Sequence, residues 1–259
     1  GIVLLPGGAI VIDTLPFPHE TAEMVEFIRD HGIPGARFVI NTHFHGDHTY
    51  GTCFFPNATV ISHRACRDAL LTWGQRRLSE AKLLTPALQE VVLRLPDVVF
   101  DDEMHLHTDG RNLHLMHLPG HTADSIGIIV EGDRVLFSGD AVMPVPYRPW
   151  GNREQLRSSL ATVLTLRPEM IVQGHGEILL RGEIADTVES SINYLDNIKD
   201  RVEELIGRGG SEADLRKIDI ETCGRSRIAL DGLVSQLHEA NLKALYKLHQ
   251  EQQQRGPAC

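Results

Sequence analysis

Six consecutive residues of this chain contain three histidines and one aspartate: His43, His45, Asp47 and His48. The cluster comes directly after Phe38-Val39-Ile40, an apolar run typical of a buried strand. In an extended segment side chains alternate between two sides, so His43, His45 and Asp47 share one side. Imidazole nitrogens and carboxylate oxygens are ligands that zinc accepts at roughly 2.0–2.2 Å. The segment therefore predicts a metal-binding loop at a strand end, with His48 directed to a second, neighbouring metal.

Three further candidate ligands stand beside glycine at the ends of expected strands: His121, Asp140 and His175. Glycine lets the backbone turn sharply and come close to an ion. Any one of these residues alone is a weak signal, because a lone histidine beside a glycine is more often an ordinary surface-loop residue. Together with the first cluster they form an ordered set of seven ligands, enough for two metal ions.

The apolar periodicity alternates between strands and helices in both halves of the chain. A hairpin is expected over 2–12, and strands are expected over 38–40, 59–61, 170–172 and, as short alternating runs, 98–137. Helices are expected over 20–30, 64–73, 76–95 with an interruption near Pro86, 153–166, 183–206 and 230–248. This alternation favours a layered α/β protein.

The motif order His-x-His-x-Asp-His, Pro-Gly-His-Thr, Ser-Gly-Asp and Gly-His-Gly resembles the metallo-β-lactamase superfamily, and more narrowly its glyoxalase II and lactonase branch. The resemblance covers residues 2–175 and extends through the helix expected to end near Ile206. It implies a four-layer αββα sandwich of two mixed sheets with helices outside. We expect a catalytic domain over 1–206 and a C-terminal helical extension over 207–259.

The resemblance also implies a role for each ligand. His43, His45 and His121 would bind the first metal, Asp47, His48 and His175 the second, and Asp140 would bridge both. β-Lactamases with two zincs differ at this bridging position, so Asp140 argues against a dedicated β-lactamase. We expect two divalent ions, first of all Zn²⁺, with Fe or Mn as the other metals such a site accepts.

The expected activity is hydrolysis of an ester, thioester, lactone or related acyl bond by a metal-bridging hydroxide. Two divalent ions, two carboxylates and one hydroxide leave a charge of about +1, able to polarise a carbonyl and hold an oxyanion. Asp47 would guide the proton as the bond breaks. The alternative is an oxidoreductase similar to the mononuclear-iron persulfide dioxygenases, which would use His43, His121 and Asp140; all seven ligands are kept, which favours two metals.

Residues around the ligands are further candidates. Asp13, at the end of an expected strand, is a candidate carboxylate to receive the second N–H of a ligating histidine, and an ordinary turn-capping role is an equal alternative. Thr42 and Thr122 adjoin ligands in the same way. The loop after Asp140 supplies candidate substrate-binding residues, Tyr147, Arg148 and Trp150, and a proline-stiffened surface loop without that role is an equal alternative. Met143 stands near the position where acyl-homoserine lactonases typically carry a tyrosine, which argues against that activity.

The composition of the chain argues against some classes of binding partner. The net charge of −10 opposes a nuclease, because nucleic acid selects basic surfaces. No apolar run approaches the 18 or so residues of a membrane helix. The four cysteines form no CxxC pair and are expected as free thiols in a reducing, cytoplasmic setting, although the start Gly1-Ile2-Val3 suggests a missing N-terminal segment. We expect a small-molecule acyl substrate, no nucleic acid, no membrane, and a homodimer as an open alternative.

Four other histidines alternate through the strand-rich segment: His105, His107, His114 and His117. We expect these to be packing or surface groups and leave them outside the site.

Overall fold

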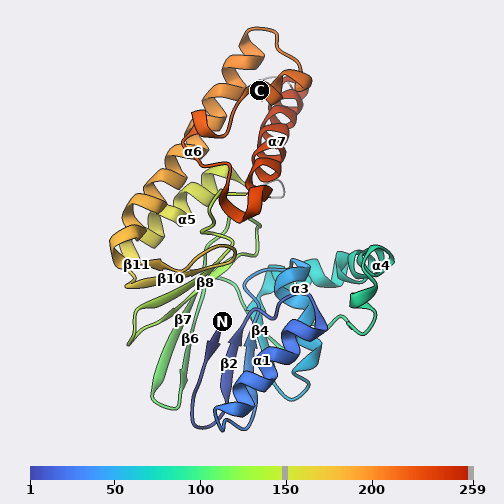
Figure 1. Ribbon diagram of the computed structural model, residues 1–259, viewed down its shortest axis with the longest axis vertical. Coiled ribbons are helices and arrows are strands. Elements are labelled where there is room, and N and C mark those ends of the chain that lie inside the picture. Colours follow the sequence, from blue (N-terminus) through green and yellow to red (C-terminus); the bar gives the residue numbers. More distant parts are fainter. Residues whose placement is uncertain (148–150, 256–259) are drawn as a thin grey trace. The chain divides into compact units, whose positions relative to one another are not determined.

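The computed structural model describes residues 1–147 and 151–255. These residues fall into two compact units. The first unit comprises residues 1–118 and 124–139, and the second comprises 119–123 and the chain from Asp140 onward. In Figure 1 the first unit runs from blue to green and most of the second from yellow to red.

The first unit contains a five-stranded mixed sheet in the order β1-β2-β3-β4-β5. Its strands are β1 (Ile2–Val3), β2 (Ala9–Ile12), β3 (Ala36–Ile40), β4 (Thr59–His63) and β5 (Val98–Phe100). The first two strands are antiparallel, and each later strand runs parallel to the strand before it. The predicted hairpin over 2–12 is confirmed, with Ile2 opposite Val11 and Val3 opposite Ile10.

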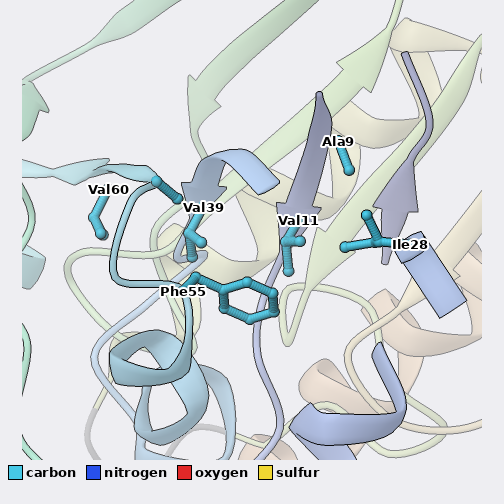
Figure 2. Packing of buried hydrophobic residues seen from close by; sticks show 7 residues of the cluster. Ala9, Val11, Ile28, Val39, Phe55 and Val60 are labelled. Atoms are coloured by element: carbon cyan, nitrogen blue, oxygen red, sulfur yellow. The ribbon is translucent and has the colours of Figure 1, made fainter. Parts of the chain in front are cut away.

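Short helical segments connect these parallel strands. They are α1 (Pro18–Asp30), α2 (Gly46–Thr49), η1 (Tyr50–Phe54), α3 (Arg64–Ala69), the π-helical turn η2 (Leu70–Gly74), α4 (Gln75–Leu84) and η3 (Pro86–Leu88). One face of the sheet packs on Ile28 of α1 and on Phe55, through Val11, Val39 and Val60 (Figure 2). The residues that alternate with these, such as Ile10 and Ile40, are also fully buried. Burial of both faces explains why β2 is apolar throughout rather than alternating.

A second sheet begins in the first unit with four consecutive antiparallel strands. These are β6 (Glu103–Thr108), β7 (Arg111–His117), β8 (Ile126–Val130) and β9 (Val135–Gly139). Ile126, the first residue of β8, donates its N–H to the carbonyl of Thr42 at 2.9 Å. The start of the histidine-rich loop is therefore hydrogen-bonded to the second sheet.

The second unit is mainly helical. It contains α5 (Arg153–Leu166), the antiparallel pair β10 (Met170–Gln173) and β11 (Leu179–Leu180), α6 (Arg181–Gly207), three short 3₁₀ turns, and α7 (Leu233–Arg255). The turns are η4 (Glu212–Lys217), η5 (Glu221–Cys223) and η6 (Ala229–Gly232). Helix α6 contacts both α5 and α7, which run alongside it (Figure 1). The helices expected over 153–166 and 183–206 are confirmed.

Two expected helices differ from the structure. For the helix expected over 76–95, the interruption near Pro86 is confirmed because α4 ends at Leu84, but the continuation is wrong because residues 89–95 are not helical. Pro86 lacks the N–H that would continue α4, and Gln89 and Lys82 instead close the loop with reciprocal side-chain to carbonyl hydrogen bonds of 3.1 Å. The helix expected over 64–73 is α-helical only to Ala69 and then widens into the π turn.

A domain boundary between residues 206 and 207 stays a prediction. Within the described residues, α7 packs on α6 and belongs to the same compact unit as it does. Cys53, Cys66 and Cys223 are free thiols. Every helix among the residues that the structure describes is too short or too polar to cross a membrane.

Candidate metal centre

The loop after β3 gathers the first four candidate ligands. His43 Nε2 lies 2.9 Å from Nδ1 of His45, and the rings of His43 and His48 have centroids 4.1 Å apart. Nε2 of His48 lies 3.4 Å from Oδ2 of Asp47. His43 and His48 are buried, whereas the Asp47 side chain is 40% exposed. These nitrogens and oxygens are close enough to converge on a cation, and the chain's own fold holds them there.

Asp13 fixes the base of this loop. Its carboxylate accepts hydrogen bonds from the Thr42 N–H at 2.8 Å and the Thr42 hydroxyl at 2.8 Å. Its Oδ2 also lies 2.7 Å from Nδ1 of His48. A proton on that Nδ1 donates to Asp13 and leaves Nε2 as the nitrogen with a lone pair for a metal. Asp13 adopts a φ of 57°, the left-handed region that non-glycine residues rarely enter.

Asp124 is a site residue that the sequence reasoning missed. Its carboxylate accepts the backbone N–H of Phe44 at 2.8 Å, between His43 and His45, and the residue is 2% exposed. Burial, aided by the negative charge of Asp124, raises the pKa of the Cys66 thiol well above its usual value. Its partner is a backbone N–H group, so the sequence carries no specific signal for this contact.

The second unit brings together the other three candidate ligands. Oδ2 of Asp140 lies 3.3 Å from Nε2 of His121 and 3.6 Å from Nε2 of His175. Asp140 and His121 are buried, and the His175 side chain is 38% exposed. One carboxylate oxygen thus faces two imidazoles. The donor set is the kind that divalent metals prefer.

The loop after Asp140 positions His121 through its backbone. Nδ1 of His121 lies 2.6 Å from the carbonyl oxygen of Tyr147, to which it donates, so that Nε2 is the ring nitrogen on the Asp140 side. The side-chain amide of Asn241, a buried residue of α7, donates to the adjacent carbonyl of Pro146 at 2.6 Å. Helix α7 therefore supports the loop that orients His121.

The remaining predicted site residues lie beside His121 or in the loop after Asp140. Thr122 is buried, and its carbonyl accepts the N–H of Gly120 at 2.9 Å. Burial raises the pKa of the Tyr147 phenol, which keeps it protonated at neutral pH. Arg148 and Trp150 lie outside the described residues.

Two glycines beside ligands are required by geometry. Gly120 has a φ of 135°, and a Cβ there would lie 2.1 Å from the backbone nitrogen of Leu156. Gly139 has a φ of 48°, and a Cβ there would lie 2.8 Å from the Thr42 side chain, which Asp13 holds in place. Larger residues would therefore displace the chain next to His121 and Asp140.

Histidines and aspartates grouped near strand ends of an α/β framework, as in this chain, are typical of metal-binding α/β proteins. A family model described as the metallo-beta-lactamase superfamily matches residues 2–175. The chain belongs to this superfamily, and its predicted fold, two sheets with helices and a C-terminal helix, is confirmed.

Among curated relatives, the chain is similar to a beta-lactamase-like protein 2 homolog of Caenorhabditis elegans, 27% identical over 71% of this chain and 55% of the relative. It is 38% identical to the hydroxyacylglutathione hydrolase GloC of Haemophilus influenzae, over 34% of this chain and 45% of that protein. It is 27% identical to the acyl-coenzyme A thioesterase MBLAC2 of Bos taurus, over 60% of this chain and 58% of that protein. The chain thus spans a little over half the length of the first of these relatives.

Among solved structures, a metallo-beta-lactamase from Pontibacter korlensis superposes with a TM-score of 0.59 at 18% identity, over 73% of this chain and 84% of that chain. At this identity the likeness concerns the fold alone.

Proposed function

We propose that this protein is a metal-dependent hydrolase that cleaves an ester, thioester, lactone or related acyl bond. The observation that carries the proposal is the placement of one buried carboxylate oxygen, Oδ2 of Asp140, beside the imidazoles of both His121 and His175. A carboxylate between two imidazoles suits a ligand shared by two cations. The superfamily membership supports a metallohydrolase in general.

In this proposal the protein binds two divalent ions, with Zn²⁺ as the first expectation. His43, His45 and His121 serve one ion, Asp47, His48 and His175 serve the other, and Asp140 serves both. The ions would supply Lewis acidity and a water whose pKa is lowered to about 7.

The chain's own residues then have distinct tasks. Asp13 holds His48 in the tautomer that presents Nε2, and the Tyr147 carbonyl does the same for His121. Asp47, whose side chain is 40% exposed, would receive a proton from the attacking water and return it to the leaving group. The protonated phenol of Tyr147 is a candidate donor to the carbonyl oxygen as charge develops there.

Thioesters are the first substrates to test. Two relatives carry names that denote thioester hydrolysis, the hydroxyacylglutathione hydrolase and the acyl-coenzyme A thioesterase. The anticipated partner is a small acyl compound, and the acidic net charge of −10 still opposes a nucleic acid.

The decisive experiment combines metal counting with turnover. Protein purified without added metal is analysed for metal per chain and assayed on acyl-glutathione, acyl-coenzyme A and lactones. About two zincs with hydrolysis, both lost in Asp140→Ala and His45→Ala, would support the proposal. Full metal content and full activity in those variants would refute the ligand assignment. About one iron per chain, with oxygen uptake on persulfides, would replace the hydrolase by the dioxygenase alternative.

A further inference from the structure

We propose that the solvent-facing side of the β6–β7 hairpin is a separate binding site for a divalent transition metal, formed by Glu103, His105 and His114. None of these residues belongs to the seven-ligand set. One ligand atom from each lies within 4.8 Å of the others. The site involves the first unit alone.

Strand pairing brings the two imidazoles together. His105 and His114 are directly opposite one another in the antiparallel register, and cross-strand partners on one face have neighbouring side chains. Their rings are stacked, with centroids 4.3 Å apart and planes inclined by 13°. Because β6 and β7 are linked by a short turn, the backbone register of the hairpin holds these two histidines opposite one another.

Carboxylates complete the donor set. Oε2 of Glu103 lies 2.9 Å from Nε2 of His114, and Oε1 of Glu131 lies 3.7 Å from Nδ1 of His105. Tetrahedral bonds of about 2.0–2.1 Å separate ligand atoms by about 3.3 Å. To bind one ion, the two stacked rings must tilt toward one another, and the exposure of the His105 and Glu103 side chains leaves room for this movement. Two imidazoles with one or two carboxylates suit Zn²⁺.

The neighbouring His107 marks the limit of the site. Its Nδ1 lies 2.8 Å from Oδ1 of Asn112, its opposite residue, which occupies that nitrogen. The ring of His107 is farther from His105, with centroids 6.2 Å apart. The proposed ligands are therefore the two histidines nearest to Glu103.

The test counts Zn²⁺ ions. Whole protein that retains its tightly bound metal is dialysed against a weak chelator, titrated with Zn²⁺, and examined by native mass spectrometry. The wild type is expected to take up one Zn²⁺ more than the double variant His105→Ala/His114→Ala. The variant Glu103→Gln, which keeps both imidazoles, should bind the extra ion about tenfold more weakly than the wild type does.

The matched control is His31→Ala/His249→Ala, which removes two histidines from α1's C-terminal end and from α7. It should take up the same number of ions as the wild type. Equal Zn²⁺ uptake by the wild type and the His105/His114 variant, with both folded by circular dichroism, would overturn the proposal. Hydrolase activity should be unchanged in all these variants, so the outcome is distinguishable from a failure of the proposed function.

Discussion

Asp13 and His48 form a close contact across 35 positions of the chain, with Oδ2 of the carboxylate 2.7 Å from Nδ1 of the imidazole. The same carboxylate holds both the N–H and the hydroxyl of Thr42, the residue before His43. One side chain at the end of β2 thus sets the geometry at both ends of the histidine-rich loop.

Asp13→Asn should lower metal affinity by about 10- to 100-fold, because an amide accepts the imidazole proton less strongly than a carboxylate and disturbs the Thr42 contacts. The measurement is competition for Zn²⁺ against a chelator of known affinity. Asp30→Asn, at the exposed end of α1, is the control and should leave affinity unchanged. Wild-type affinity in Asp13→Asn would show that the contact with His48 does not affect the affinity for Zn²⁺.

Tyr147→Phe should lower kcat by about 100-fold with little change in metal content, if the phenol donates to the developing oxyanion. Burial raises the pKa of this phenol, so it stays protonated through the neutral range. The variant should therefore keep the shape of the wild-type pH–rate profile below pH 9 or so. Tyr246→Phe, in α7, serves as control. A loss confined to KM would instead make Tyr147 a substrate-binding residue only.

Gly120→Ala should destabilise the fold by about 3 kcal/mol or more, because the new methyl group meets the backbone of α5 at a positive φ. Chemical denaturation of the metal-loaded protein measures the change. Gly182→Ala, in α6, is the matched control, since a Cβ there has no neighbour within 4 Å. That change should be neutral or stabilise by up to about 1 kcal/mol. Equal effects of the two substitutions would disprove the close approach of Gly120 to Leu156.

His238 should make stability fall on mild acidification. Its Nε2 donates to the Ile218 carbonyl at 3.0 Å, and its Nδ1 lies 2.9 Å from the Tyr194 hydroxyl, which donates to it. Burial lowers the pKa of His238 below its usual 6.5. As pH falls through 6.5 the unfolded chain takes up the proton first, so stability is present above that pH and is lost below it, down to the folded pKa.

The measurement is the unfolding free energy of the wild type and of His238→Gln between pH 7.5 and 5.5. The variant should be less stable at pH 7.5 but should lose less stability on acidification, by about 1.4 kcal/mol for each unit of difference between the two pKa values. His31→Gln, an exposed substitution in the first unit, should follow the wild type. Parallel curves for His238→Gln and the wild type would contradict the pKa shift.

Much of this molecule could be predicted from local patterns. The hairpin at 2–12, helices α5 and α6, and the grouping of His43, His45 and His48 follow from periodicity and spacing. Asp13 could be proposed because it ends an apolar strand.

Other features depend on contacts that leave no local pattern. Asp124 accepts the backbone N–H of Phe44, a group that every residue type except proline carries. Asn241 meets Pro146 from 95 positions away. The π turn at 70–74 has no signal in the helical periodicity, and neither has the loss of helix at 89–95, beyond the interruption that Pro86 predicted.

The hydrogen bond from Asn241 to Pro146 has a consequence for the order of biosynthesis. The Tyr147 carbonyl fixes the ring of His121, and Asn241 of α7 holds the adjacent Pro146 carbonyl from 95 positions further along the chain. A nascent chain released up to residue 200 would already contain every proposed ligand but not this support. The orientation of the His121 ring should therefore be completed only after α7 has been synthesised and has packed on α6.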